Sequence, residues 1–148
     1  MHGEGCTWIV TADGGRARVL EERRRGVALA ERAAFAHDRD ADAAPRDRPA
    51  RVQESAGPAR HAVEPRIAPH EAGERAFLQR LAAFLDDGAA KGAYEELVLF
   101  APPRALGVLR NALSGPARGR IAGEAALDVT RETPEAVAAR LAHLRHGE

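Results

Sequence analysis

The residues best suited to chemistry lie between positions 47 and 66, where arginines, one imidazole and two carboxylates of glutamate follow one another closely. The most distinctive part reads Arg60-His61-Ala62-Val63-Glu64. A guanidinium group binds a phosphate or a carboxylate through two parallel hydrogen bonds, and an imidazole accepts or donates a proton near neutral pH. This stretch therefore predicts either an anion-binding surface or an acid–base centre.

As a binding surface, the stretch would contact the phosphates of tRNA or ribosomal RNA, and its affinity would fall with salt. The arginines that would make these contacts are Arg48, Arg51, Arg60, Arg66 and, after a later buried strand, Arg104.

As a hydrolase, the chain would use His61 as a general base oriented by Glu64. Arg60 or Arg104 would stabilise an oxyanion, and Asp13 is an alternative carboxylate. In that case His61→Ala should lower the turnover of aminoacyl or phosphate esters by about 10²–10⁴-fold. Two interpretations without catalysis stay open: internal pairing of Arg60 and Arg66 with Glu54 and Glu64, and a protein-interaction or attachment role for the loop.

Other familiar chemistries are excluded by residue type and spacing. The single cysteine rules out an internal disulfide and every multi-cysteine zinc pattern. Neither serine lies in a G-x-S-x-G elbow, and there is no phosphate-binding P-loop. The acidic run at 38–42 lacks the glycine and the glutamate of a calcium loop, and His61, Glu64 and His70 fit no common zinc spacing. We expect no metal and no cofactor.

Composition limits the class of protein further. The 22 basic and 22 acidic residues cancel, which argues against indiscriminate nucleic-acid binding but leaves a local basic patch open. The 21 arginines accompany 33 alanines and one lysine, as a GC-rich coding sequence would produce, so their number alone is weak evidence for RNA recognition. No apolar run approaches the ~20 residues of a membrane span, and the first residues do not resemble a signal peptide. We therefore expect a cytoplasmic protein without a membrane span.

The elements that must position these residues alternate between strands and helices. Period-2 and period-3.6 patterns predict strands over 7–12, 16–21, 96–101 and 121–129, and helices over 69–88 and 104–113 and from 133 onward. Residues 27–35 fit a third strand or a short helix. Two or three strands in a meander followed by strand–helix–strand crossovers predict an α/β fold, a mixed β-sheet flanked by helices, in one domain over 1–148.

Residues 37–69 form a long Pro/Arg-rich loop in this interpretation. The stretch contains five prolines, six acidic residues and six arginines, and it predicts no regular element. A connection of this length is either an ordered functional loop or a disordered excursion, and the sequence leaves both open. Self-association through the loop is also left open.

Several segments together resemble the host attachment protein family. They are Trp8–Arg18, Asp47–Arg51, Ser55–Gly57, Arg60–Pro65 and Leu99–Gly107. That family is similar to the bacterial branch of the archaeo-eukaryotic release factor superfamily, so the resemblance implies a ribonuclease H-like sheet, as in the middle domain of release factors. It also implies a translation-associated module that approaches tRNA or the ribosome.

The resemblance has one clear departure at the position of the catalytic loop. Release factors carry Gly-Gly-Gln there, whereas the corresponding loop here reads Ser55-Ala56-Gly57-Pro58-Ala59-Arg60-His61. Gln53 lies nearby but has no flanking glycines. The sequence therefore favours a binding module over a peptidyl-ester hydrolase.

Overall fold

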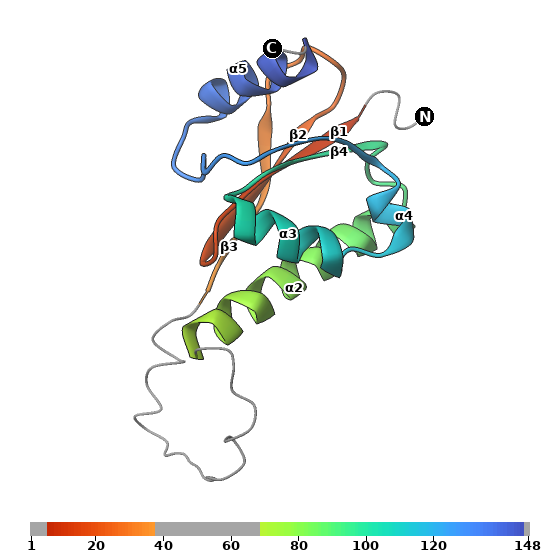
Figure 1. Cartoon of the computed structure of the whole chain (residues 1–148). Coiled ribbons are helices and arrows are strands. Elements are labelled where there is room, and N and C mark those ends of the chain that lie inside the picture. The colour runs from red at the N-terminus through yellow and green to blue at the C-terminus, as the bar shows by residue number, and fades with distance from the viewer. Residues whose placement is uncertain (1–5, 38–68, 147–148) are drawn as a thin grey trace, which may run out of the picture.

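A five-stranded mixed sheet forms the centre of the computed structural model, which describes residues 6–37 and 69–146 (Figure 1). The strands are β1 (Thr7–Ala12), β2 (Arg16–Glu22), β3 (Ala30–Ala36), β4 (Glu96–Phe100) and β5 (Ile121–Ala125), in the order β3-β2-β1-β4-β5. β1, β2 and β3 pair antiparallel, whereas β4 and β5 run parallel to β1. The predicted α/β fold with a mixed sheet is confirmed.

Helices cover both faces of this sheet. They are α2 (Pro69–Ala90), α3 (Pro103–Ala112), the single turn α4 (Gly115–Arg118) and α5 (Pro134–Arg145). In Figure 1, α2, α3 and α4 lie below the sheet and α5 lies above it. Because side chains alternate along a strand, each inner strand must supply apolar residues to both layers.

The larger core lies between the sheet and α2–α3. Trp8 is buried between two rings, with centroids 5.5 Å from Phe84 and 4.7 Å from Tyr94. The Tyr94 hydroxyl donates a hydrogen bond to the Leu85 carbonyl at 2.8 Å, and burial raises the pKa of Tyr94 to about 12. The predicted helical stripe faces this core, with Phe77, Leu81 and Leu85 buried and Phe84 half-buried.

The smaller core lies under α5. Ile9 from β1 and Phe100 from β4 pack there against Val137 and Leu141 of α5. β1 and β4 thus bury side chains on both faces, which explains why both read as nearly continuous apolar runs.

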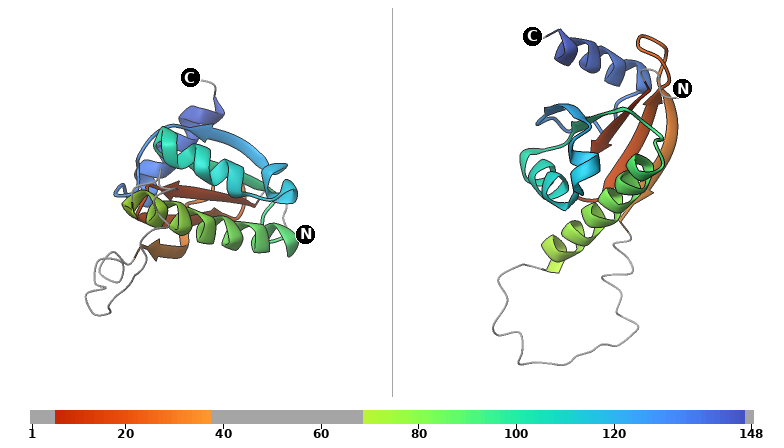
Figure 2. Two further views of the ribbon diagram at one scale, coloured as in Figure 1. Left: turned by 60° about the horizontal axis from the view of Figure 1, so that its bottom comes forward. Right: turned by 90° about the vertical axis from the view of Figure 1, so that its right-hand side faces the viewer.

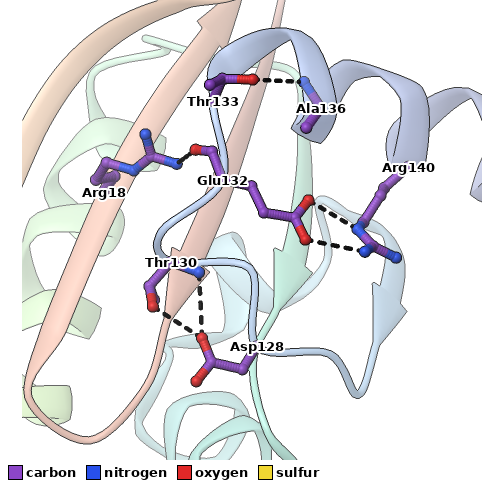
Figure 3. Close-up of polar contacts among 7 residues, drawn as sticks. All are labelled: Arg18, Asp128, Thr130, Glu132, Thr133, Ala136 and Arg140. Carbon is purple, nitrogen blue, oxygen red and sulfur yellow. Dashed lines mark hydrogen bonds and ion pairs between the residues drawn. The ribbon is translucent and has the colours of Figure 1, made fainter.

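The segment that leads into α5 is tied down by polar contacts (Figure 3). The Arg18 guanidinium donates to the Glu132 carbonyl at 2.6 Å, and the Glu132 carboxylate accepts two hydrogen bonds from Arg140, each 2.9 Å. The Thr133 hydroxyl accepts from the Ala136 N–H at 3.1 Å, so Thr133 caps the helix as the sequence predicts.

The structure decides one open prediction and differs from the sequence predictions at two elements. Residues 30–36 form a strand, one of the two alternatives for 27–35, with Ala33 and Phe35 packed against the larger core. β5 ends at Ala125, where the Leu127 N–H turns back to bond the Ala125 carbonyl at 2.9 Å. α4 was not predicted.

Two further expectations, the long loop and the lack of a membrane span, can be compared with the structure only within its described residues. The long loop falls at 38–68, outside the described residues, apart from its ends at His37 and Pro69. Within the described ranges, no helix combines the length and apolar character needed to cross a membrane.

Candidate functional site

The candidate site lies at the carboxyl ends of the parallel strands β1 and β4. At this edge the chain turns from β1 into the neighbouring strand β2, and it continues from β4 into the helix α3. A crevice outside the carboxyl ends of strands, where connections diverge, is where α/β folds usually bind ligands. Here it is a cavity of about 230 Å³, with Gly14 at the strand edge and charged side chains at its walls: Glu71, Glu74, Arg75 and Arg104.

Asp13 shapes the turn beside this cavity. Its Oδ1 accepts hydrogen bonds from the backbone N–H groups of Gly15 and Arg16, each 2.8 Å, and its own N–H donates to the Arg16 carbonyl at 3.0 Å. Such an Asp turn fixes the tight connection between the two strands. The observed role of Asp13 is thus structural, and its role as an alternative catalytic carboxylate stays a prediction.

Arg104 stands at the mouth of the cavity, in the first turn of α3. Its Nη2 lies 2.6 Å from Oε2 of Glu71, which comes from the first turn of α2. The Arg104 side chain is 60% exposed and that of Glu71 is 36% exposed, so water screens the pair and the guanidinium can exchange partners. Arg104, which the sequence predicts to bind RNA, thus lies at the surface in a solvent-screened pair, and its contact with an external anion stays a prediction.

Glu74 and Arg75 complete the charged lining, and the sequence analysis missed them. The Glu74 carboxyl lies directly over Gly14, where a Cβ atom would come within 2.5 Å of its Cδ. Within the described residues this half-buried carboxylate has no polar partner, and Arg75 beside it is exposed. The signal available in the sequence was an acid–acid–base pattern at 71, 74 and 75, at the start of a helix that follows the long loop.

The other predicted site residues lie outside the described part of the chain. These are His61 and Glu64, proposed for catalysis, and Arg48, Arg51, Arg60 and Arg66, proposed for RNA binding. The described chain stops before them at His37, whose N–H bonds the Gly15 carbonyl at 2.8 Å and whose ring centroid lies 6.1 Å from that of Phe77. Their convergence with Arg104 remains a prediction.

A metal site and a reactive thiol find no support in the residues the structure describes. Across 6–37 and 69–146, no three His, Cys, Asp or Glu side chains gather closely enough to hold an ion. Cys6 is buried, and burial together with the Glu21 carboxylate raises the pKa of its thiol to about 11. A thiol with so high a pKa is a poor nucleophile at neutral pH.

Comparisons with known proteins agree with this architecture. The model of a family described as "Protein required for attachment to host cells" matches residues 8–141. No curated protein matches the sequence.

Two solved structures resemble the chain in fold. One is an archaeal translation termination factor, aRF1, with a TM-score of 0.51 and 13% identity over 94% of this chain and 38% of that one. The other is titled only an archaeal protein, with a TM-score of 0.46 and 11% identity over 94% of this chain and 36% of that one. The chain thus spans little more than a third of either structure. Its fold is that of a release factor domain, and by sequence the chain belongs to the family of proteins required for attachment to host cells.

Proposed function

We propose that this protein is a release-factor-related module that binds tRNA or ribosomal RNA through the surface around the cavity at the carboxyl ends of β1 and β4. The observation that carries the proposal is the position of Arg104, an exposed guanidinium at the mouth of that cavity. The likeness to an archaeal termination factor supports the class of partner.

The charged residues at the cavity allow a phosphate group of RNA to replace the carboxylate that pairs with Arg104. Arg104 already binds the carboxylate of Glu71 at 2.6 Å, and a phosphate group offers the same guanidinium two oxygens for a bidentate contact. Arg75 lines the same cavity and is exposed, so two cations can face one phosphate group. Glu71 and Glu74 favour selective contact over indiscriminate polyanion binding, because they repel phosphates that are not held by the arginines.

The proposal is tested by sedimentation of the full chain with ribosomes and by binding to unfractionated tRNA at about 50 mM and about 200 mM salt. We expect association at low salt and a fall in affinity at the higher concentration. Arg104→Ala should reduce the slope of log affinity against log salt by about 0.7–0.9, the effect of one lost phosphate contact.

The matched control is Arg131→Ala. Arg131 is an exposed arginine in the segment leading into α5, on the opposite face of the sheet, and it has no polar partner within 6–37 and 69–146. Its loss removes the same charge, and we expect the slope to stay at the wild-type value. Protein that stays wholly in the ribosome-free fraction at low salt, and that does not bind tRNA, would overturn the proposal.

A role in attachment to host cells is the second candidate, and the family description supports it. In this case the protein would act by contact with another protein and without catalysis. A strain that lacks the protein should then attach poorly and recover on complementation. Arg104→Ala would change partner capture while leaving RNA affinity unaltered.

A further inference from the structure

We propose that the tip of the β2–β3 hairpin, residues 23–28, is a second phosphate-contacting surface. It binds the backbone of the same RNA at a distance from the cavity. This inference rests on the proposed function, since it extends the contact with RNA. The tip lies at the end of the sheet opposite the start of α2 (Figure 2, right).

The tip presents three consecutive arginines to solvent. The side chains of Arg23 and Arg25 are 76% and 61% exposed. Each forms a loose, exposed ion pair, at 3.7 Å from Arg23 to Glu21 and 3.6 Å from Arg25 to Glu96. Arg24 is exposed, and its guanidinium has no polar partner in the described chain, although its carbonyl accepts a hydrogen bond from the Val27 N–H at 3.0 Å. Such ion pairs contribute little, so the three guanidinium groups are available to another ligand.

The two carboxylates that precede the tip are less exposed than its arginines. Glu21 is 14% exposed, and it faces both Arg23 and Arg32 at 3.7 Å. Glu22 is buried and pairs with Arg145. Glu31, on β3 beyond the tip, is exposed. Within residues 23–28 the only charged side chains are the three arginines, although the chain as a whole has no net charge.

The tip is also held in a fixed shape. The Glu22 carboxylate accepts two hydrogen bonds from Arg145 of α5, at 2.7 and 3.0 Å, and a third from the Gly26 N–H at 3.0 Å. Gly26 adopts a φ of +91°, which the turn requires and which other residues rarely adopt. A buried ion pair thus anchors the turn to the sheet and to the last helix, and a preordered surface loses less entropy on binding.

The chemistry of the tip fits a phosphate backbone better than a lipid surface. Guanidinium groups match phosphate oxygens geometrically, and neighbouring arginines can bind successive phosphates of one strand. The only large apolar side chain exposed there is Val27, at 38%, which is too little to insert into a bilayer.

The test compares two triple variants of the full chain in RNA binding. The tip variant is Arg23→Ser/Arg24→Ser/Arg25→Ser, and the control is Arg80→Ser/Arg118→Ser/Arg131→Ser, which removes the same charge from exposed positions elsewhere. Binding of a fluorescent oligouridine is measured between about 50 and 200 mM salt, and circular dichroism verifies that both variants fold. Loss of three phosphate contacts should reduce the salt slope by about 2, so that over this range wild-type affinity falls about twentyfold more than that of the tip variant.

The outcomes separate this inference from the proposed function. Equal slopes for the tip and control variants would overturn the inference alone. Loss of binding to phosphatidylglycerol vesicles in the tip variant, with RNA binding unchanged, would also overturn it and assign the tip to a lipid surface. A wild-type chain that binds no RNA at about 50 mM salt would overturn both proposals. Weakened RNA binding in the tip variant, with normal binding in Arg104→Ala, would support the hairpin and contradict the cavity surface.

Discussion

At the scale of single residues, the carboxylate of Glu22 is buried and yet stays ionised at neutral pH. Only 3% of the residue is exposed. Burial alone would raise the pKa of this carboxyl, but hydrogen bonds from Arg145 and the Gly26 N–H, with the charges of Arg145 and Arg25, bring the pKa below its ordinary value of 4.5. A group whose pKa is lower in the folded than in the unfolded state stabilises the fold above the unfolded pKa and loses that effect as pH falls through the folded pKa.

The first prediction follows from this buried charge. Glu22→Gln leaves the Arg145 guanidinium partly buried without its counter-charge, and we expect the free energy of unfolding at pH 7 to fall by about 3 kcal/mol. The difference between wild type and variant should shrink below pH 4.5, as the wild-type carboxyl is protonated. Urea unfolding as a function of pH measures both effects.

Glu132→Gln is the matched control for this prediction. Arg140 hydrogen bonds also lower the pKa of Glu132, but this pair is more exposed, at 28% for Glu132 and 43% for Arg140. We expect its substitution to change stability little at any pH. A loss from Glu22→Gln no larger than that from Glu132→Gln would show that the hairpin anchor is not a buried ion pair.

At the residue level, a side chain's place in the fold could be predicted where chain order alone sets it. Arg104 follows a buried strand and a Pro-Pro pair, so its place at the carboxyl edge of the sheet could be inferred. Glu74 could not be placed in this way. Its position over Gly14 depends on how α2 crosses the sheet, 60 residues along the chain, and a sequence pattern does not contain that packing angle.

At the scale of elements, two helical glycines have opposite surroundings. A Cβ at Gly88 of α2 would lie 2.7 Å from the Trp8 ring, whereas one at Gly107 of α3 would meet nothing within 4 Å. The Trp8 ring cannot move aside, because Phe84 and Tyr94 pack against it. Overpacking costs about 1–3 kcal/mol, and alanine gains about 1 kcal/mol over glycine in a helix.

The second prediction is that Gly88→Ala destabilises the protein and Gly107→Ala stabilises it. We expect their free energies of unfolding to differ by about 2 kcal/mol, as measured by denaturant unfolding. An equal gain from both substitutions would mean that α2 does not press on Trp8 as closely as described.

The third prediction concerns the start of α5. Thr133→Ala removes the hydroxyl that accepts the Ala136 N–H, and this should lower stability by about 1 kcal/mol. Thr133→Ser keeps the hydroxyl and should retain most of that stability. If Ser and Ala have the same effect in thermal unfolding, the cap does not hold α5.

An element could be predicted when its residues fit the periodicity of only one kind of secondary structure. The apolar runs of β1 and β4 and the stripe of α2 admit one interpretation each. Ala30 to Ala36 admitted two, because small alanines fit both helical and strand periods, and pairing of β3 along β2 decides the matter. α4 escaped prediction because Ser114-Gly115-Pro116 has the composition of a break, although Pro116 also suits a first helical turn.

At the scale of the whole molecule, the two surfaces proposed to contact RNA lie at opposite ends of the sheet. The cavity with Arg104 lies at the carboxyl ends of β1 and β4, and the basic hairpin tip lies at the other end of the same sheet. The predicted fold class and family are confirmed, because both depend on the order of elements and on motifs spread along the chain. RNA binding stays a proposal, since most of the arginines singled out for it lie within 38–68, outside the described residues.

Hydrogen–deuterium exchange of the full chain with and without tRNA tests the central claim most directly. In the first turn of α3, the backbone N–H groups of Arg104 and Ala105 have no helical partner and exchange readily when free, whereas the Leu106 N–H donates to the Pro102 carbonyl at 2.8 Å. We predict that tRNA slows exchange at 13–16 and 103–106, around the cavity, and leaves the segment 134–145 of α5 unchanged. Slowed exchange confined to α5, or no change anywhere at a saturating concentration of tRNA, would contradict binding through the carboxyl edge of the sheet.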